Sequence, residues 1–260
     1  MRIPVIRGVI DRRILVNYRV DPAALARLLP PPFRPKLIHG AGMAGVCLIR
    51  LQHVRPRFFP SWLGITSENA AHRIAVEWDD GAERREGVYI PRRDSSSRLN
   101  ALVGGRLFPG VHHHARFDVR ENDDHYRVAL DSDDGRTHLA VEGVVAPELP
   151  ASSVFRSLAE ASEFFRRGSL GYSATGRPGV YDGLELRTFH WCVQPLAVTA
   201  AESSFFGDRE NFPAGAAEMD CALLMRQVEH EWHGRPPLIA DVVHGAAAAR
   251  GAHADAGHMA

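Results

Sequence analysis

Segments in which apolar and β-branched residues recur are separated by turn residues along most of the chain, and this pattern predicts strands. The expected strands are residues 13–20, 45–51, 72–78, 87–90, 113–119, 126–130, 138–142, 184–193 and 221–229. The triplet Asp-Asp-Gly interrupts the pattern at 79–81 and again at 133–135. Because such triplets favour tight turns between strands, each one predicts a hairpin.

Two other segments have the spacing and end signals of helices. Asp21 suits the N-cap and Pro22 the first position of a short helix over 23–29, which the prolines at 30–32 end. The clearest helix is expected over 153–167, where a broad apolar face recurs at helical spacing through Phe155, Leu158, Ala159, Ser162, Phe164 and Phe165.

Many strands at short spacing with few helices predict an α+β protein built around a curled antiparallel sheet or barrel. No internal repeat or linker divides the chain, so we expect one domain over residues 1–241. The remaining residues, 242–260, are rich in Ala, Gly and His and are expected to form a disordered tail.

The composition narrows the class of protein. With 45% apolar residues and a formal net charge of zero, the chain is typical of a soluble globular protein without a nucleic-acid partner. No apolar run approaches the roughly 20 residues that span a bilayer, and no signal-peptide core opens the chain. We therefore expect no membrane partner and a cytoplasmic location. Cys47, Cys192 and Cys221 are far apart in the sequence and are expected to be buried, inert thiols rather than zinc ligands.

The basic residues limit the chemistry that is available. Of the 31 lysines and arginines, only Lys36 is a lysine. Arginine stays protonated and does not form an imine, whereas a desolvated lysine can. Lys36 is therefore the one side chain able to act as an amine nucleophile, and it follows the helix-ending prolines in an expected loop.

Three stretches carry motifs of one known family in matching order and spacing. They are Tyr18 to Phe33 with its proline stop, the segment Gly-Ile-Thr-Ser-Glu at 64–68, and Gly-Arg-Leu-Phe-Pro-Gly-Val-His-His-His at 105–114. In these stretches the chain resembles the acetoacetate decarboxylase-like superfamily. A fourth stretch, 155–191, is more similar to its uncharacterised YqjF-like branch. The resemblance implies a cone-like antiparallel β-barrel with a few flanking helices, an internal pocket and a homo-oligomer.

The resemblance also implies roles for particular residues. The two adjacent lysines of the decarboxylases fall on His113 and His114 of this sequence. The first of those lysines forms the imine, and imidazole cannot replace it, so Schiff-base decarboxylation is not expected. Glu68 matches an active-site glutamate of the family. An arginine near the N-terminal strand of the family corresponds to Arg12 or Arg13, and we take Arg12 as the candidate.

These residues define the expected function, a small-molecule enzyme that acts on a carbonyl or carboxylate compound without a Schiff base or cofactor. Glu68 with His113 or His114 would supply acid–base chemistry of the lyase or isomerase type. The substrate would be held by Arg106, Arg12, His112 and His190. The alternative is a non-catalytic small-ligand-binding or structural barrel. A cavity in which Glu68 meets a histidine would favour the enzyme.

The run His112-His113-His114 also raises the question of a metal. Because side chains alternate along a strand, only His112 and His114 could face one site. A third ligand would have to come from His72, His190 or Glu68. We prefer the interpretation that the histidines are pocket or core residues, and no metal is expected.

Overall fold

Thirteen strands form one sheet in the part of the chain that the computed structural model describes, residues 4–98 and 110–240. Its strands are β1 Ile6–Val20, β2 Arg34–Pro35, β3 Leu37–Ile38, β4 Ala41–Pro56, β5 Ile65–Asp80, β6 Glu83–Ser95, β7 His112–Glu121, β8 His125–Ser132, β9 His138–Val145, β10 Leu170–Ala174, β11 Val180–Thr188, β12 Gln194–Ser203 and β13 Ala217–Ile239. Its helices are α1 Pro22–Leu28, α3 Leu158–Arg167, α4 Ser204–Gly207 and the 3-10 turn η1 Ser61–Leu63. The expected tail, 242–260, lies outside the described residues.

The predicted curled, mainly antiparallel sheet is confirmed, and the two hairpins at 79–81 and 133–135 are present. Gly81 and Gly135 have φ angles of 63° and 67°, which glycine adopts without strain. The strand expected over 184–193 is wrong at its end, because β11 stops at Thr188. The chain leaves the sheet there, and Trp191 Nε1 donates a hydrogen bond to Ser162 Oγ on α3 at 2.9 Å. Strand β12 was not predicted.

Both expected helices form, but α3 is shorter than its apolar pattern predicted. Asp21 Oδ1 accepts a hydrogen bond from the Ala24 amide and so caps α1 as expected. In α3 the cap is Ser157, whose hydroxyl accepts from the Glu160 amide. Residues 153–157 are irregular, and Ser153 Oγ donates a hydrogen bond to Asp220 Oδ2 on β13 at 2.7 Å.

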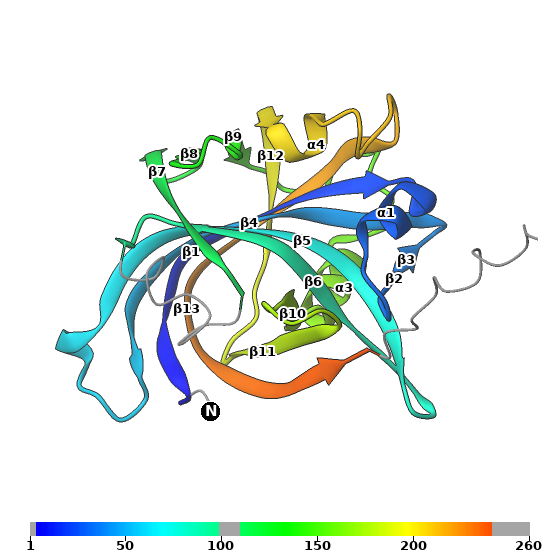
Figure 1. Cartoon of the computed structure of the whole chain (residues 1–260). Coiled ribbons are helices and arrows are strands. Elements are labelled where there is room, and N and C mark those ends of the chain that lie inside the picture. The colour runs from blue at the N-terminus through cyan, green and yellow to red at the C-terminus, as the bar shows by residue number, and fades with distance from the viewer. Residues whose placement is uncertain (1–3, 99–109, 241–260) are drawn as a thin grey trace, which may run out of the picture.

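Five strands, in the spatial order β13-β1-β4-β5-β6, form a central layer that is closed on both sides. On one side β6 pairs with β7, and the path continues through β8, β9 and β12 back to β13. On the other side β6 pairs with β10, β10 with β11, and β11 with β13. Figure 1 shows the first set of strands above the arch of the central layer and the second set below it. The central layer therefore separates two compartments.

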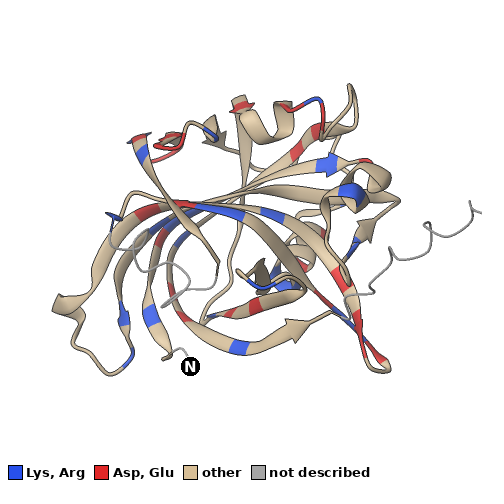
Figure 2. Ribbon diagram, viewed as in Figure 1, with Lys and Arg blue, Asp and Glu red and all other residues tan. Residues whose placement is uncertain are grey.

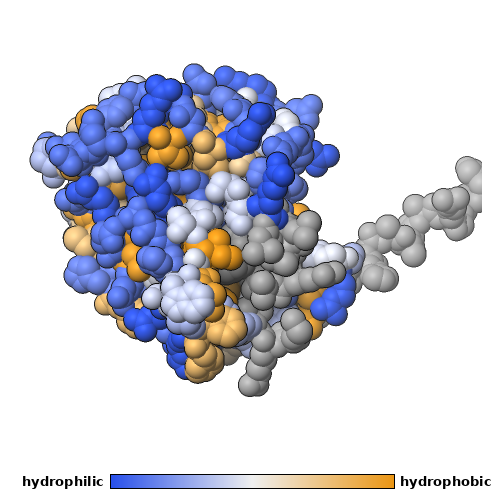
Figure 3. Space-filling model, turned by 90° about the vertical axis from the view of Figure 1, so that its left-hand side faces the viewer, coloured by the Kyte–Doolittle hydropathy of each residue, from blue (hydrophilic) through white to orange (hydrophobic). Residues whose placement is uncertain are grey.

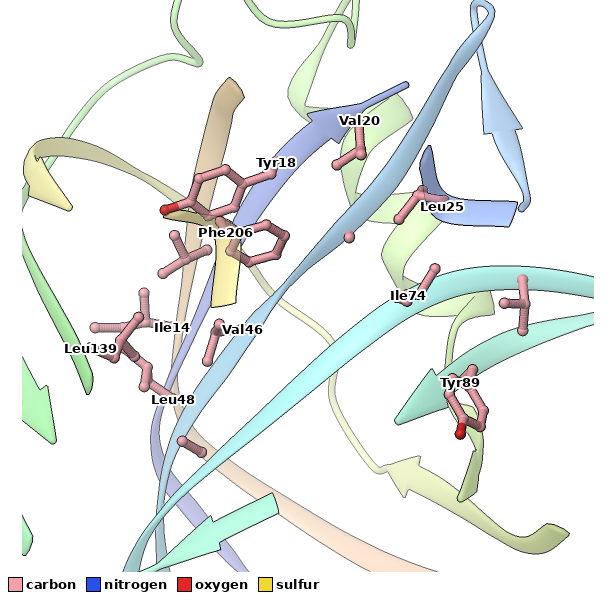
Figure 4. Close-up of a cluster of buried hydrophobic side chains, with 14 of the residues drawn as sticks. Ile14, Tyr18, Val20, Leu25, Val46, Leu48, Ile74, Tyr89, Leu139 and Phe206 are labelled. Atoms are coloured by element: carbon pink, nitrogen blue, oxygen red, sulfur yellow. The ribbon is translucent and has the colours of Figure 1, made fainter. Parts of the chain in front are cut away.

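The first, which we call the packed compartment, lies between the central layer and β7, β8, β9, β12 and α4. Alternate residues of β1, among them Ile14, Val16 and Tyr18, face it and meet buried residues of the opposite strands such as Leu139. Tyr18 stacks on Phe206 of α4 with ring centroids 3.9 Å apart. Figure 4 shows these apolar side chains gathered over the central strands.

The second, which we call the hollow compartment, lies between the other face of the central layer and β10, β11 and α3. Leu15 of β1 faces it, as do Cys221, Leu223 and Met225 of β13. The aromatic face predicted for α3 covers it, because Phe155, Phe164 and Phe165 pack on one another at centroid distances of 5.3 to 5.5 Å. These side chains leave part of the space empty, as the next section describes.

The surface carries a group of exposed apolar side chains on the loop between β4 and β5. Phe58 is 82% exposed and Trp62 is 79% exposed. Figure 3 views the molecule from the side of this loop, and hydrophobic residues gather in the lower part of that face.

Of the cysteines, Cys47 and Cys221 are buried as expected, but Cys192 is exposed, which corrects the prediction for that residue. No helix in residues 4–98 or 110–240 has the length and apolar character that crossing a membrane requires.

Candidate functional site

A cavity of about 160 Å³ occupies the hollow compartment. Residues of β1, β4, β5, β6, β7, β10, β11 and β13 line it, together with Phe165 of α3. Most of the lining is apolar, including Ile49, Leu51, Leu184 and Leu186. A concave apolar space with a few polar groups is the usual form of a small-molecule site.

Arg13 reaches the cavity from β1 because of strand alternation. Arg13 and Leu15 project to the hollow face, whereas Arg12 and Ile14 project to the packed face. Arg13 Nε donates to Cys47 Sγ at 3.2 Å, and its guanidinium lies 5.9 Å from the ring centroid of Trp191. Arg13 therefore rests on neutral groups of the hollow compartment.

Arg73 enters the cavity from β5 and is 9% exposed. Its cross-strand neighbour on β4 is Gly45, and the partner of Gly45 on β1 is Asn17. With no side chain at Gly45 to intervene, Arg73 Nη2 reaches across and donates to Asn17 Oδ1. The guanidinium also lies 4.9 Å from the ring centroid of Phe165. Burial lowers the pKa of Arg73 to about 10, so the side chain is still a cation at neutral pH.

Arg93 enters from β6, on the far side of β5. Its Nη1 donates to Ser173 Oγ on β10, and burial lowers the pKa of Arg93 to about 10. Gly110 lies against this guanidinium with a φ angle of 81°, and a Cβ there would come within 2.8 Å of Arg93 Nη1. Glycine at 110 thus gives Arg93 its room. His112, the partner of Arg93 on β7, also lines the cavity.

The three cavity arginines, Arg13, Arg73 and Arg93, share one electrostatic property. Among the described residues none of them forms an ion pair with a carboxylate, and their hydrogen bonds go to a thiol, an amide and a hydroxyl. Burying a cation without a counter-charge is costly. The cavity is consequently electropositive and suited to an anion.

Glu68, the first predicted catalytic residue, lies on the opposite face of the central layer. Its carboxylate accepts hydrogen bonds from Arg12 Nη2 and Arg50 Nε, both at 2.5 Å, and Glu121 of β7 contacts the same two arginines. Figure 2 shows acidic and basic segments side by side on the central strands. Neither Glu68 nor Arg12 lines the cavity. Of the two arginines that the motif allowed, Arg13 is the one that does.

The predicted histidines are divided among three environments. His112 lines the cavity, whereas His113 Nδ1 lies 3.2 Å from Asp134 Oδ2 and His114 Nδ1 lies 2.7 Å from Asp133 Oδ2. His190 is exposed. Arg106 falls in residues 99–109, outside the described residues. The structure therefore does not gather the predicted residues at one point, and catalytic roles for Glu68, His113 and His114 stay predictions.

One of the residues that line the cavity, Asp94, carries a buried carboxylate. Its side chain accepts a bidentate hydrogen bond from Arg92, which also binds Asp134. Burial raises the pKa of Asp94, and the charge of Arg92 opposes that rise. In the described part of the chain the Asp94 carboxylate pairs with Arg92 and forms no ion pair with the cavity arginines.

Lys36 lies outside the cavity. Its ammonium pairs with Glu86 at 2.8 Å and sits 4.3 Å from the ring centroid of Phe164. Within the described ranges, no three or more His, Cys, Asp or Glu side chains are grouped as metal ligands.

Sequence reasoning missed Arg73, Arg93 and Asn17. The available signal was a charged residue within a mainly apolar part of a strand, such as Arg73 directly before Ile74, Ala75 and Val76. A charged side chain at such a position needs a buried polar environment or a ligand. The pattern could not show that three distant strands bring these arginines together.

Solved structures with the same fold include acetoacetate decarboxylase-like proteins. The chain aligns with an acetoacetate decarboxylase-like enzyme from Sphingomonas wittichii RW1 with a TM-score of 0.61 and 12% identity, covering 92% of this chain and 95% of that one. For acetoacetate decarboxylase from Legionella pneumophila the TM-score is 0.60 with 10% identity, over 91% and 88% of the two chains. The enduracididine biosynthesis enzyme MppR, complexed with pyruvate, matches at 0.60 with 11% identity, over 92% and 91%.

At these identities the structures show a shared fold and not a shared activity. None of the curated proteins matches the chain. The model of DUF2071, described as an uncharacterized conserved protein (COG2071), matches residues 10–228, which is most of the chain. The protein therefore belongs to the DUF2071 family and has the acetoacetate decarboxylase-like fold.

Proposed function

We propose that this protein is a small-molecule enzyme that binds a carbonyl or carboxylate compound in the hollow compartment and acts on it without a Schiff base. The observation that carries the proposal is the cavity with Arg13, Arg73 and Arg93, which have no carboxylate partner in the described part of the chain. Guanidinium groups bind carboxylates through paired N–H donors, and this pairing is strongest where water is excluded.

Proton transfer in this cavity falls to His112. It is the histidine among the lining residues and lies beside Arg93 on the neighbouring strand. An imidazole can remove a proton next to a carbonyl while an arginine stabilises the negative charge that develops on the oxygen. Isomerisation, hydration, dehydration and retro-aldol cleavage all use such steps. The pyruvate complex of MppR supports a substrate that is small and carries both carbonyl and carboxylate groups.

An imine mechanism has little support in this chain. Lys36 is its one lysine, and the Lys36 ammonium is paired with Glu86 rather than directed into the cavity. Borohydride reduction in the presence of acetoacetate is expected to leave the mass of the protein unchanged. A trapped covalent adduct would overturn this part of the proposal.

The second candidate is a non-catalytic carboxylate-binding protein with the same cavity. The observation that favours it is the engagement of the predicted acid–base residues elsewhere, since Glu68 pairs with two arginines and His113 and His114 with aspartates. In this candidate the arginines bind the ligand and no bond changes.

We also place the chain in the YqjF-like branch and propose a cytoplasmic homo-oligomer. The exposed aromatic side chains of the β4–β5 loop, Phe58, Phe59 and Trp62, support an association surface. Light scattering of the purified chain tests this part, and a monomer at micromolar concentration would contradict it.

Native mass spectrometry of the purified chain against a panel of small keto, hydroxy and unsaturated acids tests the main proposal. We expect retention of a carboxylate by the native chain and its loss in Arg73→Gln. Turnover of the retained compound, followed by NMR, should be abolished in His112→Gln with binding preserved. Binding without turnover would favour the second candidate, and failure of every carboxylate to bind would overturn both.

A further inference from the structure

The cavity arginines are divided between two ends of the space. Arg13 and Arg73 lie on either side of Cys47 of β4. Arg13 pairs with Ile49, two residues after Cys47, and donates a hydrogen bond to the Cys47 sulfur. Arg73 pairs with Gly45, two residues before Cys47. The charge of Arg13 contributes to the lowered pKa of Arg73, after burial, so these two cations are close. The pKa of Arg93 is lowered by burial alone. The side chains show the same division, because Arg73 reaches toward β1 to bind Asn17, whereas Arg93 binds Ser173 on β10.

The register of the strands defines what lies between the two ends. Cys47 pairs with Ala71 of β5, and Ala71 pairs with Arg93 of β6. Cys47 and Arg93 are thus two strand spacings apart, about 10 Å along the sheet. Ala71 lines the cavity between them, and its small side chain leaves the space over the sheet open.

The charges of the side chains that line the cavity predict the charge of its ligand. Three guanidinium cations and one carboxylate, that of Asp94, line the cavity, so the charges of the lining side chains sum to two positive charges. The Asp94 carboxylate pairs with Arg92, and no ion pair joins it to a cavity arginine in the described residues. One carboxylate would satisfy one end and leave the other end as an uncompensated buried cation, which is costly. A ligand with an anionic group at each end would satisfy both.

We infer that the ligand of this cavity is a short dicarboxylate, bound with one carboxylate between Arg13 and Arg73 and the other at Arg93. This inference rests on the proposed function and names its substrate class. A cavity of about 160 Å³ is close in size to one that holds benzene, so the dicarboxylate has roughly three to five carbon atoms. Its chain lies over Ala71.

The test compares ligands that differ by one charge at nearly constant shape. Calorimetric titration of the native chain with succinate and with its monoamide, succinamate, gives the affinity attributable to the second carboxylate. We expect succinate to bind at least ten-fold more tightly. Malonate and glutarate, each with its own monoamide, extend the comparison to shorter and longer chains. If none of the three dicarboxylates binds more tightly than its monoamide, the inference is overturned, while binding of both would leave the proposed function intact.

Variants locate the two ends. Arg93→Gln should remove the preference for succinate while leaving succinamate affinity within two-fold, and Ala71→Val should weaken both ligands because it fills the space between the ends. Arg84→Gln, at an arginine whose side chain is 70% exposed, is the control and should change neither affinity. An unchanged preference in a folded Arg93→Gln would overturn the assignment of that end. If that variant does not fold, Arg93→Lys and the native ligand pairs still decide the question. Failure of every carboxylate to bind the native chain would instead overturn the proposed function.

Discussion

The packed and hollow compartments share the same five central strands but use them for different purposes. On the packed face, Ile14, Val16 and Tyr18 of β1 meet apolar side chains from the opposite strands, and the space is filled. On the hollow face, Arg13 and Asn17 of the same strand meet polar partners around a cavity. A close-packed interior supplies stability, whereas a hollow with unpaired cations lowers stability and supplies a binding site. In a single strand such as β1, one face therefore contributes to stability and the other to the binding site.

Truncating the packed compartment should have the largest effect on stability. Phe212 is 1% exposed and packs against Phe205 and Phe206. Phe212→Ala should reduce the free energy of unfolding by about 4 kcal/mol, because buried apolar contacts are lost and a cavity remains. Urea denaturation measures the change. Phe58→Ala, at an exposed ring, is the control and should stay within about 0.5 kcal/mol. Equal effects of the two substitutions would show that the packed compartment is not the main source of stability.

Removing Glu68 separates stability from ligand binding. Arg12 is 2% exposed, and Glu68→Gln takes away one of its two carboxylate partners. The free energy of unfolding should fall by about 3 kcal/mol, because a buried cation loses part of its counter-charge. Carboxylate affinity should not change, since Glu68 lies on the packed face. A variant of normal stability with impaired turnover would instead support the catalytic role predicted for Glu68.

Acid should destabilise the protein through the histidine of the packed compartment. His72 packs against Phe205 with the ring centroids 4.8 Å apart, and burial, assisted by the charge of Arg92, lowers the pKa of His72 to about 4. Because the unfolded chain binds this proton near pH 6.5 and the folded chain does not, stability is lost as the pH falls from 6.5 toward 4. The contribution of His72 between pH 6.5 and pH 5 is about 1.5 kcal/mol.

His72→Phe should remove this contribution from the pH profile of chemical denaturation. Part of the acid sensitivity should remain in the variant, because burial also lowers the pKa of His230 to about 4. A profile identical to that of the native chain would show that folding does not lower the pKa of His72, contrary to its buried environment.

The smallest effect on stability is expected in the hollow compartment. Arg93→Met replaces a buried cation without a carboxylate partner by an apolar side chain, so the free energy of unfolding should change by about 1 kcal/mol or less. The same variant should lose dicarboxylate affinity at least ten-fold. A destabilisation as large as that of Phe212→Ala would show that Arg93 supports the fold rather than a ligand.

Local signals in the sequence were sufficient for the elements and for part of the chemistry. Apolar and β-branched segments between turn residues located parts of β1, β4, β5 and β13, the Asp-Asp-Gly triplets located two hairpins, and Asp21 located the start of α1. Each of these depends on residues that are neighbours in the chain, so each can be read without the fold. The scarcity of lysine was equally visible, because it depends on composition alone.

Only the tertiary structure decided which residues face the cavity. Alternation shows that Arg12 and Arg13 point to opposite faces, but not which face is hollow. An irregular pairing between Ile10 and Arg12 places Ile10 on the hollow face and Arg12 on the packed face, although they are two residues apart. Arg93 and Arg13 line the same cavity although their strands, β6 and β1, are separated in the sheet by β5 and β4. Sequence motifs identified the fold, but strand order and closure on both sides of the central layer assembled the site.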